Sequence, residues 1–445
     1  MTTADRIKPV YEPASKEPAS PGRRAFAPLA RALASLWLVL LALVAALPRA
    51  AMAQGFETTI VDARDSFRRH DRVRLAALRA QAAAERNPLA MWVDYWELTN
   101  RINEVQPPEF AAFAQRWSGT YVEDRLRNDW LLELVRRRDR AAFAADYPRF
   151  RMNDDREVTC FALANDQLSG KDVRDAGLAA WLAQKDADDG CAFLAATLVD
   201  AKQLAPADIW KKVRASIEAG RPRAARQAAG LISDAAGAAM AEIVDSPARY
   251  LAKKAGTATR ADAELATLAL ARLAATDSET AAALLAERWE RALPADLASY
   301  AWTSIARQSA IKLQPEASDQ FLRAARVLGK SAREIELSDD TLAWKVRAAL
   351  RADNGRARWQ QVVQAINAMS PAEQKEAAWV YWKARGLQAL ARDSQDGESL
   401  LATSRELLAG IAAQLNFYGA LAAEDLGQAQ TLPARPAPLT AAERD

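Results

Sequence analysis

The chain has 445 residues, with 60 lysines and arginines against 57 aspartates and glutamates. A single compact core stops growing at roughly 250–300 residues, so this length predicts several domains or an extended array. The near balance of charge gives no electrostatic reason to expect a nucleic-acid partner. One histidine and two cysteines are too few for a zinc site, and no Ser-His-Asp or Cys-His arrangement is visible in the sequence.

The first 53 residues have the order of a secretory signal peptide. A basic segment ending at Arg31 precedes an apolar run at residues 32–47, and the small residues that end at Ala53 form a cleavage pattern. We therefore expect cleavage between Ala53 and Gln54, and a periplasmic protein with no stable membrane span after cleavage. The apolar run has 16 residues, whereas a spanning helix needs roughly 20; an uncleaved anchor is the alternative. An arginine pair in the basic segment leaves the twin-arginine export route open beside the general one.

Beyond the leader, apolar residues recur at helical spacing, and no segment alternates as a strand would. In residues 120–148, for example, Leu126, Trp130 and Leu134 fall on one face while charged residues fill the other. Short turns separate the helical segments. The sequence therefore predicts an all-α fold.

Polar residues mark several expected helix starts. Ser278 and Ser338 are each followed by an acid, which the helix dipole favours at an N-terminus. Ser370, Pro371 and Glu373 form a predicted capping box with proline at the first helical position.

A loose repeat runs through the second half of the chain. Ala-Trp pairs place Trp302, Trp344 and Trp379 at spacings of 42 and 35 residues, each followed by small residues. These spacings are the length of one helical hairpin, and a bulky ring facing a small residue one turn on would let stacked hairpins interlock. The pattern predicts a superhelical α-solenoid of stacked helical hairpins, shaped as a horseshoe or ring.

The composition suggests where this array ends. We expect a superhelical domain at residues 54–369 and a final group of helices at 370–429. Residues 430–445 contain three prolines and no apolar periodicity. They are expected to be a disordered tail or a truncated linker.

Residue types alone do not identify a catalytic site. His70 lies in a charged stretch and is expected at a solvated helix position. Glu97 and Glu424 have apolar neighbours, but we expect each to be a helix-surface or satisfied acid rather than a catalytic acid with a raised pKa. The tryptophans are expected in the core. We predict no catalytic, cofactor-binding or metal-binding residue, and no cofactor.

Cys160 and Cys191 are the two cysteines of the chain. In an exported protein, an even and minimal cysteine count predicts one disulfide, which would stabilise the fold by about 3–4 kcal/mol. Two buried thiols are the alternative.

Several stretches, taken in order, resemble the N-terminal superhelical region of the soluble lytic murein transglycosylases. Two late stretches also resemble the helices at the start of that family's linker domain. The segment around Cys160 is similar to a family segment whose cysteine pairs with a later one, the place filled here by Cys191. The similar stretches are NPLAMWVDYWEL (87–98), the helical pairs at 107–148, REVTCFALA (156–164), AAWVYWKARGLQALAR (377–392) and NFYGALAAEDLG (416–427).

The resemblance implies an exported helical ring or horseshoe that accompanies a lysozyme-like domain on peptidoglycan. Enzymes of this family cleave the β-1,4 bond between N-acetylmuramic acid and N-acetylglucosamine, leaving 1,6-anhydromuramic ends, with one glutamate as acid and then base. No metal or cofactor takes part. Implied partners are peptidoglycan glycan strands and other cell-wall enzymes.

The sequence departs from the family at the catalytic motifs. The family glutamate lies in a Glu-Ser motif that a Gly-Leu-Met-Gln motif follows, and neither follows Gly427. The Glu-Ser pair at Glu398 and Ser399 precedes the last aromatic helix, so we interpret it as a chance dipeptide in a turn. We expect this chain to carry the helical scaffold without the catalytic domain.

Three hypotheses follow for function. The chain is the scaffold portion of a lytic transglycosylase, either as a truncated reading frame or as a natural non-catalytic protein. Alternatively, it is an exported helical-repeat scaffold or adaptor that binds envelope proteins without enzymatic activity. A generic tetratricopeptide-like adaptor without a murein connection is the third.

Overall fold

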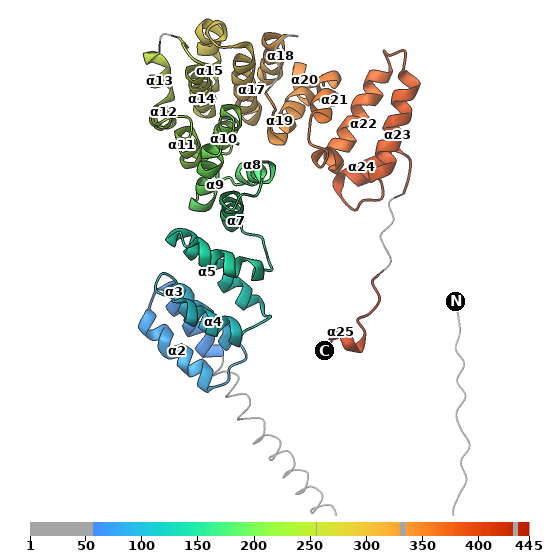
Figure 1. The fold of residues 1–445 in the computed structure, drawn as a ribbon. Coiled ribbons are helices and arrows are strands. Elements are labelled where there is room, and N and C mark those ends of the chain that lie inside the picture. Colours follow the sequence, from blue (N-terminus) through green and yellow to red (C-terminus); the bar gives the residue numbers. More distant parts are fainter. Residues whose placement is uncertain (1–56, 255, 330–334, 430–434, 445) are drawn as a thin grey trace, which may run out of the picture. The chain divides into compact units, whose positions relative to one another are not determined.

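A computed structural model describes residues 57–254, 256–329, 335–429 and 435–444, and every regular element in these ranges is a helix (Figure 1). The predicted all-α class is therefore confirmed. Ala53 and Gln54 lie outside the described residues, so the signal cleavage site stays a prediction. Within the described ranges, none of the helices is long and apolar enough to cross a membrane.

The described residues divide into two compact units, with the dividing point between Glu133 and Leu134. The predicted domain boundary between residues 369 and 370 stays a prediction. The described helices of the first unit are residues 57–68, α2 (Arg72–Ala84), α3 (Ala90–Asn100), α4 (Pro107–Arg116) and α5 (Tyr121–Arg137), the last of which runs across the dividing point.

The second unit is a succession of helices that pack mainly on their neighbours in sequence. Pairs such as α17 with α18, α22 with α23, and α11 with α12 form hairpins, as an α-solenoid requires (Figure 1). Its helices are α6 (Arg140–Asp146), η1 (Tyr147–Arg149), α7 (Arg156–Leu168), α8 (Arg174–Ala183), α9 (Asp189–Asp200), α10 (Pro206–Glu218), α11 (Pro222–Gly230), α12 (Asp234–Asp245), α13 (Pro247–Lys253), α14 (Arg260–Thr276), α15 (Ser278–Leu284), η2 (Leu285–Trp289), α16 (Glu290–Ala292), α17 (Ala295–Ile311), α18 (Ala317–Leu328), α19 (Asp339–Leu350), α20 (Ala352–Gly355), α21 (Trp359–Asn367), η3 (Glu373–Lys375), α22 (Ala377–Ala391), α23 (Gly397–Ile411), α24 (Phe417–Asp425) and α25 (Ala441–Arg444).

The predicted helix starts are correct in part. The Ser338 side chain accepts a hydrogen bond from the backbone N–H of Thr341 and begins α19, as expected. At α15 the cap is Asp277 rather than Ser278, because the Asp277 carboxylate accepts from the backbone N–H of Thr280.

The predicted capping box at Ser370 does not cap the long helix that follows it. The Ser370 hydroxyl accepts a hydrogen bond from the Glu373 backbone N–H at 3.3 Å. Glu373 is the first residue of the short 3-10 helix η3, whose N-cap is Ala372. Glu376 then has an extended backbone, with ψ of 131°, and the long helix α22 begins one residue later at Ala377.

The repeated tryptophans lie on three long helices, α17, α19 and α22. Trp302 and Trp379 are 2% and 7% exposed, which agrees with the expected core role. An arginine guanidinium also lies over each of the three rings. The Cζ atom of Arg323 is 4.3 Å from the centroid of the Trp302 ring. Arg347 lies 4.8 Å from the Trp344 centroid and 5.2 Å from that of Trp379. Cation–π contacts therefore accompany the aromatic packing along the second unit.

The stretch 416–427 forms helix α24 together with the residues that cap its two ends. The Asn416 side chain accepts from the backbone N–H of Gly419 at 2.9 Å and caps the helix. A Cβ on Gly419 would lie 2.1 Å from the backbone oxygen of Gln414, so this position requires glycine. Tyr418 packs on Tyr381 of α22, with ring centroids 5.7 Å apart. Beyond α24, residues 441–444 form a single helical turn, α25.

Candidate functional site

The acids considered from the sequence do not form a catalytic pair. Glu97 is buried and accepts hydrogen bonds from Arg79 at 3.2 Å and Arg101 at 2.6 Å, so it is a satisfied acid as expected. Glu424 is exposed on α24. Glu398 is exposed in the first turn of α23, so the prediction that it lies in a turn outside a helix is wrong.

His70 also lies elsewhere than expected. It is exposed, but in the turn before α2 rather than in a helix, with a φ of 55°. Its Nδ1 lies 2.9 Å from the Asn100 side-chain oxygen. The charged residues around His70 led us to predict a helix at this position. The helix at residues 57–68 instead ends before His70, whose own backbone is left-handed.

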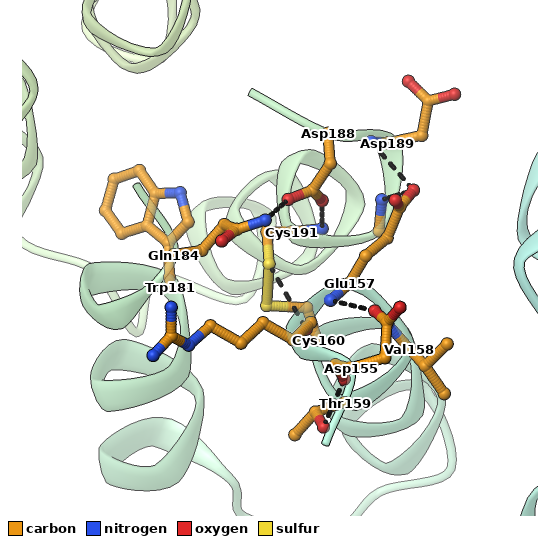
Figure 2. Close-up of a disulfide and its surroundings, with 12 residues drawn as sticks. Asp155, Glu157, Val158, Thr159, Cys160, Trp181, Gln184, Asp188, Asp189 and Cys191 are labelled. Atoms are coloured by element: carbon orange, nitrogen blue, oxygen red, sulfur yellow. Dashed lines mark hydrogen bonds between the residues drawn. A yellow bond between two sulfur atoms is a disulfide. The ribbon is translucent and has the colours of Figure 1, made fainter. Parts of the chain in front are cut away.

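The two cysteines lie between neighbouring helices of the second unit. Cys160 of α7 and Cys191 of α9 are joined in a disulfide, with Cα atoms 4.8 Å apart (Figure 2). The Glu157 carboxylate accepts a hydrogen bond at 3.2 Å from the backbone N–H of Gly190, which further ties α9 to α7. Burial raises the Glu157 pKa, with repulsion from Asp188 as a second cause. The contacts describe a structural cross-link rather than a reactive site.

A cavity of about 620 Å³ in the first unit is the strongest candidate for binding. Asp94 of α3 is one of its lining residues and is 3% exposed. One Asp94 oxygen accepts from Arg116 Nη1 at 2.5 Å and from the Trp117 indole N–H at 2.8 Å. The other accepts from Arg79 Nε. Asp94 therefore holds the side chains of Arg79, Arg116 and Trp117 in fixed positions in the wall of this cavity.

The cavity has room because of small side chains. Several alanines of α2 line it beside Arg86 and the half-buried Trp117 ring. An indole held by its N–H keeps its ring faces in place, which suits stacking against the apolar face of a sugar. Arginine side chains bind carboxylates in a fixed, bidentate geometry.

The charges of this region balance except for one arginine. Arg101 bonds two acids, Glu97 and Glu109. Its hydrogen bond is the largest cause of the lowered pKa of Glu109. The Arg86 side chain has no ion-pair partner among the residues that the structure describes. The balanced network is formed by three acids and three arginines: Asp94, Glu97, Glu109, Arg79, Arg101 and Arg116.

This arrangement was not predicted from the sequence. The tryptophans were expected in the core, yet Trp117 lines an opening. Arg79, Asp94 and Arg116 come from three helices at separations of 15 and 22 residues. Neither separation is a helical register, so no single-helix pattern could have brought them together. Arg116 and Trp117, which stand just before the turn at Gly119, were the sequence feature that could have indicated this cavity.

The helices that pack on their neighbours in sequence define an all-α, solenoid-like fold, and the first unit contains a cavity with charged and aromatic side chains in its wall. Comparison with models of protein families finds no match, and neither does comparison with curated proteins. Among solved structures, the chain is similar to an inactive mutant of lytic transglycosylase Slt from Pseudomonas aeruginosa. The two share 23% identity with a TM-score of 0.50, over 86% of this chain and 59% of that one.

The 70 kDa soluble lytic transglycosylase from Escherichia coli, alone and in complex with bulgecin A, is similar at 17% identity and a TM-score of 0.47. Those matches cover 87% of this chain and 60% of the other. The chain thus spans about three fifths of the length of these structures. The likeness to the Pseudomonas structure shows the fold, and the predicted superhelical all-α class is confirmed.

Proposed function

We propose that this chain is the helical scaffold of a periplasmic lytic murein transglycosylase and that it binds peptidoglycan. The observation that carries the proposal is the fold likeness over 86% of the chain to lytic transglycosylase Slt. The ordered sequence stretches that resemble the same family support it independently. The family reaction would be cleavage of the β-1,4 bond between N-acetylmuramic acid and N-acetylglucosamine with formation of 1,6-anhydro ends.

In this proposal the described helices hold substrate and do not supply the catalytic acid. A catalytic glutamate needs apolar surroundings that raise its pKa into the working range. Glu97 is instead neutralised by two arginines, and Glu398 and Glu424 face solvent. None of these three has the surroundings of a general acid.

The Asp94 cavity is the proposed contact with peptidoglycan. Trp117 offers a fixed aromatic face to a sugar ring, and Arg86 offers a charge without an acid partner among the described residues. Peptidoglycan combines these two features, since its sugars carry peptide stems with free carboxylates. Binding at this cavity would hold a glycan strand on the scaffold.

Purified murein sacculi test both parts of the proposal. The protein should sediment with sacculi, and mass spectrometry should find no 1,6-anhydro muropeptides above a boiled control. Anhydro products would show that a glutamate of this chain is catalytic. Failure to sediment would overturn the glycan-binding role and favour the alternative, an exported scaffold that binds envelope proteins.

Variants then locate the binding surface. Arg86→Gln and Trp117→Ala should each weaken sedimentation by about tenfold or more, because one removes a charged contact and the other the stacking face. Arg69→Gln is the matched control, since Arg69 is exposed in the same unit and does not line the cavity. Equal binding by Arg86→Gln, Trp117→Ala and the control would place the contact elsewhere.

A further inference from the structure

A second cavity lies in the other unit, with a volume of about 280 Å³. The C-terminal end of α10 lines it together with α14 and α17. Ile217, Val244 and Ala271 give it apolar walls. Small-molecule sites begin at about 300 Å³, so this cavity suits a compact ligand with short side chains.

The acid of this cavity is held in a fixed position. The Tyr300 hydroxyl donates a hydrogen bond to one oxygen of Glu218, and the Ser338 hydroxyl donates to the other at 2.9 Å. The Tyr300 phenol is protonated at neutral pH and can donate this bond, and burial raises its pKa well above the ordinary value. A carboxylate has about four acceptor positions, and Glu218 can therefore accept a further hydrogen bond from a ligand.

One cation of the cavity is not matched by an acid. Arg307 pairs with Asp340 at 2.5 Å, and Arg221 pairs with Asp186 at 2.9 Å. Arg272 is half-buried in the cavity wall and has no ion-pair partner among the described residues. A half-buried guanidinium without an acid is costly unless a ligand or solvent satisfies it.

A buried hydroxyl in the same wall is also unsatisfied. Ser304 is 8% exposed, and its Oγ makes no hydrogen bond of normal geometry to any described residue. Its interaction with the Tyr300 hydroxyl opposes the rise in the pKa of that phenol. Buried hydroxyls are normally hydrogen-bonded, so an orphan at a cavity wall indicates a position for a ligand atom.

We propose that this cavity binds a short zwitterionic peptide with small aliphatic side chains. Arg272 and Ser304 would bind the terminal carboxylate, Glu218 would accept from the ammonium group, and the apolar walls would contact the side chains. This inference does not depend on the proposed peptidoglycan function, because its residues belong to the other unit and its ligand carries no sugar.

Titration calorimetry with dialanine, as the all-L and the all-D peptide, tests the proposal on the purified protein. We expect saturable one-to-one binding of at least one of the two. Dialanine amide should bind about tenfold or more weakly, because it lacks the charged partner of Arg272. N-acetyl-dialanine should lose affinity because it lacks the ammonium partner of Glu218. No binding of either dialanine, or full affinity for both blocked peptides, would overturn the proposal.

Variants place the site. Arg272→Gln should weaken dialanine binding by about tenfold or more, and Ser304→Ala by less, since the hydroxyl is neutral. Ala275→Leu should fill the cavity without removing a polar group. It replaces Arg272→Gln as the test of the site if that variant does not fold. Arg392→Gln, at an exposed arginine outside the cavity, is the matched control. Binding that is equal in Ala275→Leu and the control would overturn the assignment to this cavity.

Discussion

The Lys212 ammonium lies 2.5 Å from the backbone oxygen of Trp181, near the C-terminal end of α8. It also donates to the backbone oxygen of Gln184, and it lies 5.6 Å from the centroid of the Trp181 ring. The side chain is only 4% exposed. Lys212 therefore satisfies carbonyl groups that the helix end leaves without partners, at the cost of a buried charge.

This burial predicts how stability depends on pH. Burial lowers the Lys212 pKa from 10.5 to about 8, although Asp188 acts in the opposite direction. Between these values the unfolded chain binds more protons than the folded one, so the free energy of unfolding should rise with pH. The rise should be about 2 kcal/mol from pH 8 to 10. Above pH 10 the raised pKa of Tyr250, about 12, acts against it.

Urea unfolding at pH 7, 8, 9 and 10 measures this effect. The quantity to compare is the difference in unfolding free energy between the wild type and Lys212→Met at each pH. That difference should be constant below about pH 8 and should change in favour of the wild type as pH rises to 10. A constant difference across the whole range would mean that Lys212 titrates normally in the folded protein.

The disulfide should be a large contributor to stability. Replacing Cys160 and Cys191 together by alanine should lower the free energy of unfolding by about 3–4 kcal/mol, because the unfolded chain regains the entropy of an open loop. A reductant should lower the stability of the wild type and leave the double variant unchanged. If the wild type, denatured without reductant, gains the mass of two alkyl groups on alkylation, the cysteines are thiols instead.

Gly190 allows α9 to approach α7 closely beside this disulfide. A Cβ at position 190 would lie 2.4 Å from the backbone oxygen of Glu157 and 2.8 Å from its Cγ. Gly190→Ala should therefore destabilise the protein by about 1–3 kcal/mol, as overpacking does. Gly230→Ala is the control, since nothing lies within 4 Å of its added Cβ; it should be neutral or stabilising. Equal thermal melts for both variants would contradict this packing.

The sequence predicted those features that depend on neighbours along the chain. Helical periodicity gave the all-α class, and the Ser338 cap follows from a contact three residues away. The same reasoning placed a cap at Ser278 instead of Asp277, because adjacent polar residues compete for the N-terminus of a helix. At Ser370 it missed the extended Glu376, whose backbone geometry depends on packing rather than on local propensity.

Both cavities depend on contacts between helices, which one sequence does not reveal. Glu218 and Tyr300 are 82 residues apart and meet only through the packing of the second unit. The expectation that tryptophans are core residues was correct for Trp302 and Trp379. It missed the role of Trp117, because composition and periodicity do not distinguish a ring in the core from a ring at an opening.

Asp94 allows a last comparison, between a buried and an exposed ion pair. Asp94→Ala would leave Arg116 and the Trp117 indole N–H without their acceptor, and Arg79 with Glu97 alone. The expected loss of unfolding free energy is about 2–3 kcal/mol. This is below the about 3–5 kcal/mol of a fully buried pair, because both arginines are partly exposed.

Asp62→Ala is the matched control. It removes an ion pair with Arg74 whose side chains are 45% and 53% exposed, so its cost should be below about 1 kcal/mol. Asp94→Ala should also weaken sedimentation with sacculi, because Trp117 and the arginines would lose their fixed positions, whereas Asp62→Ala should not. If both variants melt at the same temperature and bind sacculi equally, Asp94 does not organise the cavity.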